Sequence, residues 1–271
     1  MRIKLSEVTF KRIFEALQRR VLGLKEYYDW RFTDEGNFNR NELLKYKNIH
    51  EGKRCFIIAN GPSLADTDLS FLQNEITFCM NRIYLLFDKL NFIPTYYVVS
   101  NELILEQFAE DILKIPTQKF LNWNRRSFYM SDEKSNFLRF HYAINEKMST
   151  DILRGVYSGG TVTHACFQLA YYMGFQEVIV VGMDHNFVDT GVPSKTEVRS
   201  DEVDKNHFHP NYFPKGSKWQ LPDLNRCEYV YRDTKEKFEA ENRKVLDATI
   251  GGKCTIFPKI DYFTIFENEE L

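Results

Sequence analysis

The chain has 271 residues, with 38 acidic and 36 basic side chains and a formal net charge of −2. Its length allows one large domain with extensions or two smaller domains, and the near balance of charge argues against a general nucleic-acid-binding surface. The cysteines are scattered and form no CxxC pair, which favours buried thiols in a reducing cytosol over a zinc site. They are Cys55, Cys79, Cys166, Cys227 and Cys254.

Residues 6–30 carry apolar side chains at helical spacing with basic side chains between them. This pattern predicts an amphipathic helix that packs on the core or on a second subunit of a homo-oligomer, or that lies on an anionic membrane surface. Residues 1–7 lack the apolar run of a signal peptide, and no segment has the length and hydropathy needed to span a bilayer. We therefore expect a cytoplasmic protein, with peripheral contact to the inner face of the cytoplasmic membrane as an alternative.

From about residue 52, short apolar segments alternate with helical ones, which predicts an α/β fold with a mostly parallel sheet covered by helices on both faces. The expected strands are 55–59, 76–79, 95–99, 118–122 and 178–182, and the expected helices are 82–89, 102–114 and 162–173. We expect an insertion over 124–152 and a long loop or lid over 185–230. A helix over 234–248 and a strand over 254–258 are expected to close a catalytic domain spanning 51–271, which follows a helical extension over 1–50.

The segment Asn60-Gly61-Pro62-Ser63 follows the first expected strand and leads into a predicted helix start. Gly61 would let the backbone approach a ligand, Pro62 presets a helical φ, and Asn60 and Ser63 offer short polar side chains beside free N–H groups. Phosphate or ribose would fit there, although an ordinary strand-to-helix turn has the same composition. The segment lacks the spaced glycines of a dinucleotide site and the Gly-Lys-Ser/Thr of a P-loop.

Other polar residues follow later strands of the expected sheet, namely Asn81, Asn101 and Asp184. Ligands of open parallel sheets bind beyond the carboxyl ends of the strands, so these residues and Asn60 are expected to converge on one crevice. An amide both donates and accepts hydrogen bonds, which suits a ribose or a cytosine edge. A single asparagine at such a position is more often only a turn former.

Ser158-Gly159-Gly160-Thr161 precedes the helix expected over 162–173. Its glycines would expose backbone N–H groups at a helix start, which makes the segment a second candidate anion site. Ser158 or Thr161 would also serve as an ordinary helix cap, and both interpretations can hold together.

His207 and His209 lie in the region expected to form a lid. Histidine titrates near neutral pH and can take a proton from an acceptor hydroxyl. The two residues lack the i, i+4 register of a helical metal site and have no cysteine nearby, so a general base is favoured over a metal ligand. Surface histidines without a role are the alternative, and neither a metal site nor a resident cofactor is expected.

Taken in order, these motifs resemble bacterial sialyltransferases of the Campylobacter lipooligosaccharide type, which are glycosyltransferase family 42-like. They are also similar to the wider DUF115 group, which contains motility accessory factors and archaeal 6-hydroxymethylpterin pyrophosphokinases. The resemblance covers about residues 52–215. It rests on Asn60-Gly61-Pro62-Ser63-Leu64, Asn81 with Tyr84, Asn101-Glu102, Ser158-Gly159 and Gly182-Met183-Asp184.

The resemblance implies a Rossmann-like, inverting, metal-independent glycosyltransferase. Its donor would be a CMP-activated nonulosonic acid such as CMP-sialic acid, and its acceptor a bacterial surface glycan or a lipid-linked precursor. Asn60, Asn81 and Asn101 would then contact the CMP moiety. Ser158 and Gly159 would lie beside the phosphate or the sugar carboxylate.

The resemblance also implies that a loop histidine is the base, with His209 preferred over His207. In the sialyltransferases a tyrosine closely follows the Gly-Ile-Asp segment and helps the phosphate leave, whereas this chain has His185-Asn186 after Asp184. That role is therefore unassigned, with Tyr212 as a candidate substitute.

Two alternatives remain open. A pterin-type pyrophosphokinase would need Mg²⁺ and an acidic cluster, and Asp66 and Asp68 are the acidic pair nearest the first turn. They also suit the N-terminus of a helix. The other alternative is a non-catalytic nucleotide-binding subunit of a glycan assembly complex.

Overall fold

The computed structural model describes residues 10–129, 132–141, 146–189 and 191–267, with side chains from residue 20 onward. Within these ranges, seven strands form one parallel sheet in the order β5-β4-β3-β2-β1-β6-β9. The strands are β1 (Arg54–Ile58), β2 (Thr77–Met80), β3 (Tyr96–Val99), β4 (Gln118–Asn122), β5 (Ser135–Leu138), β6 (Glu177–Val181) and β9 (Lys244–Asp247). The expected Rossmann-like α/β class is confirmed.

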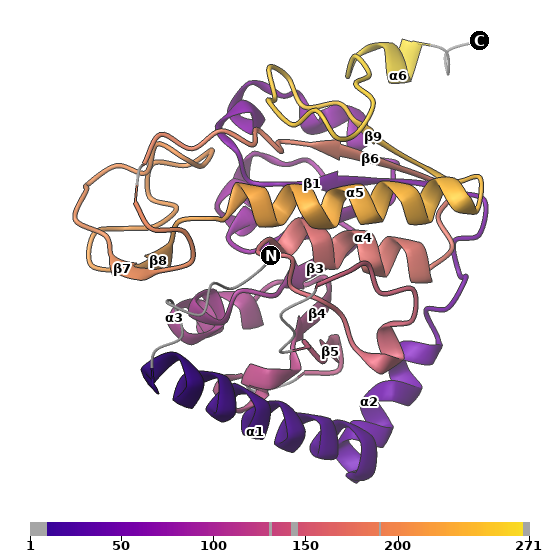
Figure 1. Ribbon diagram of the computed structural model, residues 1–271. Helices are drawn as coiled ribbons and strands as arrows, with labels where there is room; N and C mark the ends of the chain where they lie inside the picture. Colours follow the sequence, from indigo (N-terminus) through magenta and orange to yellow (C-terminus); the bar gives the residue numbers. More distant parts are fainter. Residues whose placement is uncertain (1–9, 130–131, 142–145, 190, 268–271) are drawn as a thin grey trace.

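Helices flank this sheet, and α4 and α5 lie across one of its faces (Figure 1). The α-helices are α1 (Phe10–Phe32), α2 (Asp34–Leu44), α3 (Glu102–Leu113), α4 (Val162–Tyr172), α5 (Leu224–Ala240) and α6 (Thr264–Glu267). Shorter 3₁₀ segments are η2 (Pro62–Asp66), η3 (Leu69–Leu72), η4 (Ile83–Lys89), η5 (Trp123–Phe128) and η6 (Ile152–Arg154). None of the described helices has the length and apolar character needed to cross a bilayer.

The burial of the strands and of α4 places the core at the centre of the sheet. Every residue of β2, β3 and α4 is buried, as expected where parallel strands are covered by helices. The chain runs from β1 to β5 toward one edge of the sheet and then returns to β6, on the other side of β1. The sheet therefore has a topological switch point between β1 and β6, which is where open α/β folds bind ligands.

Four sequence-based expectations about these elements are wrong, and the last of them is the strand expected over 254–258. The first turn leads into the five-residue 3₁₀ segment η2, not into an α-helix. The expected insertion over 124–152 contributes the edge strand β5, whose polar start hid it. The helix expected over 234–248 ends at Ala240, and Asn242, with φ of +57°, separates it from β9.

The strand expected over 254–258 does not form. The chain meets the sheet just after this stretch, at an isolated bridge between Lys259 and Asp247. β9 occupies the place beside β6 and is the edge strand of the sheet.

The expected lid contains a small hairpin. Strands β7 (Thr196–Val198) and β8 (Lys218–Gln220) pair in antiparallel register and lie beyond one end of the main sheet, near α3 (Figure 1). The Gln107 side chain of α3 donates to Lys218 O at 2.9 Å and accepts from Lys218 N at 2.7 Å. These bonds attach the hairpin to α3, and the irregular region ends where α5 begins at Leu224.

The N-terminal helices pack along the β5 edge of the sheet (Figure 1). Trp30 of α1 is buried against Trp123, with ring centroids 5.1 Å apart, and donates its Nε1 to Leu153 O. Asn39 of α2 donates to Phe137 O at 2.7 Å and accepts from Phe137 N at 2.8 Å. Residues 6–9 of the predicted amphipathic helix lie outside the described residues, and its remainder forms most of α1.

Candidate functional site

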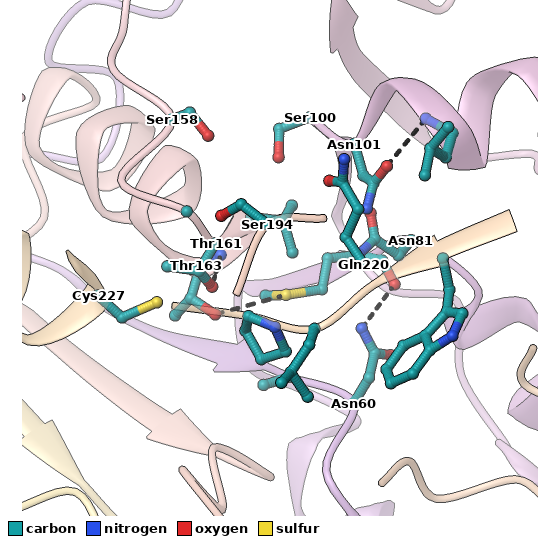
Figure 2. A pocket seen from close by; sticks show the side chains of 18 of the residues that line it. Asn60, Asn81, Ser100, Asn101, Ser158, Thr161, Thr163, Ser194, Gln220 and Cys227 are labelled. Carbon is teal, nitrogen blue, oxygen red and sulfur yellow. Dashed lines mark hydrogen bonds between the residues drawn. The ribbon is translucent and has the colours of Figure 1, made fainter. Parts of the chain in front are cut away.

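A cavity of about 1030 Å³ lies beyond the carboxyl ends of the strands. Asn60, Asn81, Asn101 and Asn122 line it, each at or just after the end of a different strand from β1 to β4. Figure 2 shows the labelled side chains of Asn60, Asn81 and Asn101 to the right of Ser158, which lies at the upper left. The structure therefore brings the predicted asparagines into one cavity at the carboxyl ends of the strands.

Two of these amides have an unused acceptor. The Oδ1 atoms of Asn60 and Asn81 are buried and have no hydrogen-bond partner among the described residues. Asn60 donates its Nδ2 to Met80 O at 3.3 Å, which fixes the amide, and Asn81 adopts a left-handed backbone with φ of +48°. A buried acceptor without a donor costs about 1–3 kcal/mol. These oxygens are thus suited to accept hydrogen bonds from a ligand.

Asn101 and Asn122 have structural partners as well as cavity positions. The Asn101 side chain accepts from Leu103 N at 2.9 Å and caps α3. The Asn122 side chain caps η5 and donates to Ser100 O. Their amides therefore fix the loops from which the cavity wall is built.

The predicted nucleotide-binding turn is joined to the loop after β6. The Asp184 carboxylate accepts from Ser63 N at 3.0 Å and from Ser63 Oγ at 2.7 Å. A Cβ atom on Gly61 would lie 1.8 Å from Asp184 Oδ2, so Gly61 makes room for Asp184. The expectation of a free Ser63 N–H at a helix start is therefore wrong. Asp184 lines the cavity, and its nucleotide contact remains a prediction.

The second predicted anion site already holds a carboxylate. Gly159 N donates to Glu146 Oε1 at 3.0 Å, and Glu146 is buried and also accepts from Arg226 Nε and Nη2 at 2.5 and 2.7 Å. Thr161 caps α4 by accepting from Thr163 N, so the capping interpretation holds for Thr161. Gly159 and Gly160 have φ of +60° and +75°, which favours glycine at both positions.

Ser158 and Gly160 line the cavity beside this cluster.

Three arginines bring positive charge to the same cavity. Arg125 pairs with Glu102 at 2.5 Å, and Arg226 pairs with Glu146. Arg20 of α1 lines the cavity without an ion pair to any described residue. Arg20 is thus the cavity guanidinium most available to an anionic ligand.

The two predicted histidines are placed differently. His207 lines the cavity, its Nδ1 lies 2.9 Å from Asp204 Oδ2, and its ring stacks on Tyr212 with centroids 3.9 Å apart. His209 is not among the described residues that line the cavity, and its Nδ1 accepts from Asn211 N. The geometry therefore favours His207 as a base, opposite to the preference drawn from the sequence.

Asp204 is well placed to orient His207. Its side chain is fully buried and also accepts from Asn206 N at 2.9 Å and Phe213 N at 3.2 Å. Burial opposes ionisation, but the hydrogen bond and charge of His207, with the Asn206 N–H, hold the pKa of Asp204 below its usual value. An ionised Asp204 fixes the proton on His207 Nδ1 and leaves Nε2 to act as a base.

Tyr212 supports this pair. The side chain is buried beneath the His207 ring, and its hydroxyl accepts from Arg82 N at 3.3 Å. Burial raises the pKa of Tyr212 well above its usual value. A phenol held neutral and stacked in this way positions the imidazole, and its direct contact with a phosphate remains a prediction.

Sequence reasoning gave no role to three functional candidates. His185 lines the cavity, with Nε2 3.2 Å from Glu228 Oε1 of α5. Asn122 ends a predicted strand as the other asparagines do, so that same pattern could have identified it. Asp204 lies only three residues before His207, whereas no local pattern links His185 to Glu228. No group of three or more His, Cys, Asp or Glu side chains within the described ranges could hold a metal ion.

Residues 32–190 match the family described as 6-hydroxymethylpterin diphosphokinase MptE-like, and this match covers more than half of the chain. The chain belongs to the MptE-like family. No curated protein matches it. The MptE-like family is part of the DUF115 and motility accessory factor group, so that part of the sequence resemblance is confirmed. The family is named after a kinase, which is consistent with a catalytic role. The MptE-like match includes Asn60, Ser158 and His185 and ends before His207.

Proposed function

We propose that this chain is a glycosyltransferase that moves a sialic-acid-like sugar from a CMP donor to a hydroxyl of a bacterial glycan. The observation that carries the proposal is the combination of buried, unpartnered amide oxygens and a His207–Asp204 pair in one cavity. The first feature suits a ligand edge rich in donors, and the second suits activation of an alcohol. The sequence resemblance to sialyltransferases supplies the donor class.

The amide oxygens fit the nucleoside part of such a donor. Cytosine presents an exocyclic amine, and ribose presents hydroxyls, and both can donate to Asn60 Oδ1 or Asn81 Oδ1. A ligand that supplies these donors removes the cost of the unpaired acceptors. Each such hydrogen bond therefore adds more to the free energy of binding than one to an exposed amide would. The acidic sugar and the phosphate would be attracted by Arg20, because Glu146 already binds Arg226 and the Gly159 N–H.

His207 would act on the acceptor. Its Nε2 would take the proton of the acceptor hydroxyl while the oxygen attacks the anomeric carbon, and Asp204 would stabilise the imidazolium that forms. Tyr212 would keep the ring in place by stacking. The Phe208 N–H donates to Asn60 O at 3.1 Å, which links the segment carrying His207 to the nucleoside wall.

A pterin-type diphosphokinase is the second candidate, and the family match favours it. The same His207–Asp204 pair could activate the pterin alcohol, and the unpartnered amides could accept from the amino and N–H groups of a pterin. Of the acidic pair that the sequence offered for Mg²⁺, Asp68 caps η3 by accepting from Ser70 N at 3.0 Å. The acidic residues that do line the cavity include Glu102, Glu106 and Glu146.

A thermal-shift panel separates these candidates. CMP, CDP, UDP and ATP would each be added with Mg²⁺ and with EDTA. Stabilisation by CMP in EDTA supports the transferase, and stabilisation by ATP only with Mg²⁺ supports the diphosphokinase. If no nucleotide raises the melting temperature, both assignments fail. His207→Ala should bind CMP as the wild type does and lose transfer, and full activity of this variant would favour a different base.

A further inference from the structure

A second histidine–carboxylate pair faces the cavity. His185 Nε2 lies 3.2 Å from Glu228 Oε1, and the His185 side chain is only 8% exposed. His185 lines the same cavity as His207 but comes from the loop after β6, whereas Glu228 comes from α5. The cavity therefore contains two imidazoles, each paired with its own carboxylate, and they come from different segments of the chain.

The backbone holds His185 in an uncommon conformation. Its φ is +55°, a left-handed value that a non-glycine residue adopts at some energetic cost and that is frequent at functional sites. The preceding residue is fixed on both sides, because Asp184 O accepts from Lys253 N at 2.8 Å and the Asp184 carboxylate binds Ser63. The position of the His185 ring is thus imposed by its neighbours.

Glu228 fixes the orientation of the ring. The hydrogen bond with His185 is the main reason that the pKa of Glu228 lies below its usual value, and Arg232 at 2.8 Å adds to it. An ionised Glu228 holds the proton on Nε2. Nδ1 of His185 makes no hydrogen bond with any described residue, so it is the nitrogen available to a ligand.

His185 lies near the start of α4, because its ring centroid is 6.2 Å from that of Tyr231, and both residues line the cavity together with Thr161. Glu228 shares α5 with Arg226, whose side chain passes within about 3.3 Å of where a Cβ of Gly160 would lie, at the start of α4. Backbone N–H groups at a helix start favour negative charge. Glu146 already binds Arg226 and the Gly159 N–H, so a donor phosphate on this side of the cavity would meet Nδ1 of His185, while His207 lies over Tyr212.

We infer that His185 is the catalytic residue that protonates the departing phosphate of the nucleotide donor. This role rests on the proposed function. The acceptor oxygen forms a bond to the anomeric carbon and loses its proton to His207 Nε2. The bond between that carbon and the phosphate oxygen breaks and its electron pair stays on the oxygen. His185, which enters the step as an imidazolium with protons on both ring nitrogens, gives its Nδ1 proton to that oxygen. Solvent then returns a proton to His185 and removes one from His207.

The test uses the full chain with CMP and CMP-N-acetylneuraminic acid as probes. His185→Ala should still bind CMP and should release CMP from the donor at least 100-fold more slowly than the wild type, as expected for loss of a general acid. Added imidazole should restore part of that rate, because it can enter the space left in the cavity. Glu228→Gln should slow release about 10-fold, and Glu239→Gln on the exposed face of α5 should match the wild type.

A second measurement does not depend on the identity of the sugar. The ³¹P resonance of bound CMP should shift between the wild type and His185→Ala and stay the same in Glu239→Gln. Unchanged CMP release in His185→Ala, or an unchanged ³¹P resonance, would overturn the role of His185. A wild-type protein that binds no CMP would instead overturn the proposed function, and this role with it.

Discussion

The Asp184 carboxylate accepts hydrogen bonds from both the N–H and the hydroxyl of Ser63, at 3.0 and 2.7 Å. This contact joins the loops that follow β1 and β6, between which the sheet reverses its strand order. Ser63 and Asp184, both predicted to contact the ligand, are therefore hydrogen-bonded to each other. This contact holds the two loops that carry Asn60 and His185.

Removing this carboxylate should loosen the site and destabilise the fold. Asp184→Ala leaves the Ser63 donors unpaired, so we expect a loss of about 1–3 kcal/mol in the free energy of unfolding. Urea titration followed by circular dichroism measures it. Asp66→Ala, which removes an exposed carboxylate from the neighbouring η2, is the matched control and should change stability by under about 0.5 kcal/mol. Equal midpoints for both variants would contradict the structural role of Asp184.

The unpartnered Oδ1 of Asn81 predicts a loss of ligand affinity on its removal. Asn81→Gly removes Oδ1 while glycine keeps the left-handed backbone, so CMP affinity should fall about 10-fold, which corresponds to about one hydrogen bond. Isothermal titration calorimetry measures the change. Asn48→Gly is the control, because Asn48 is also left-handed, with φ of +56°, but is exposed and does not line the cavity. If both variants bind CMP like the wild type, Asn81 does not contact the nucleotide.

His164 predicts an acid-sensitive core. It is fully buried in α4, and burial lowers its pKa from 6.5 to about 4. Below pH 6.5 the unfolded chain binds the proton before the folded chain does, so stability falls with pH until about pH 4 and then levels off. The expected loss is roughly 3 kcal/mol over this interval.

His164→Gln should flatten that part of the curve. Urea midpoints at pH 7, 5.5 and 4.5 for the variant and the wild type isolate the contribution of His164, because His141, whose pKa is also lowered to about 4, is present in both. Parallel pH curves would mean that His164 is not held neutral in the folded protein.

An exposed apolar stripe on α1 predicts binding to an anionic membrane surface. Val21, Leu24, Tyr28 and Phe32 share one helical face and are 65%, 68%, 61% and 61% exposed, whereas Trp30 faces the body of the protein. Lys25 is among the basic residues near the stripe. The protein should therefore sediment with vesicles containing phosphatidylserine and less with neutral ones.

The variant Val21→Ser with Leu24→Ser should lose this binding, whereas Val192→Ser, an exposed valine in the hairpin region, should retain it. Light scattering measures the oligomeric state of the wild type and of the double variant. A wild-type dimer that the double variant converts to a monomer would identify the stripe as a subunit interface instead.

The strand-end pattern made the sheet and the asparagine wall of the cavity predictable. Short apolar runs followed by Asn60, Asn81 and Asn101 fixed both the strands and their carboxyl ends, because in a parallel sheet those ends share an edge. The same logic extends to Asn122. Local sequence thus carried the part of the site that depends only on strand direction.

The partners of those groups depended on packing across long separations. Ser63 meets Asp184 and His185 meets Glu228 only after β6 and α5 are in place, and no periodicity encodes such pairings. Likewise, the choice between His207 and His209 as the candidate base depends on which ring the loop turns toward Asp204 and the cavity. The short β9 was missed because its two apolar residues continue a helical pattern.

The paired hydrogen bonds between the Asn39 side chain and the Phe137 main chain allow α2 to cover part of the β5 edge of the sheet. A parallel sheet that stopped at β5 would present bare backbone donors and acceptors, and such an edge invites another chain to add itself. One asparagine side chain satisfies the exposed main-chain groups of Phe137 as a neighbouring strand would. Removal of α2 would uncover these main-chain groups of Phe137, so we expect a variant without α2 to associate more readily through its β5 edge.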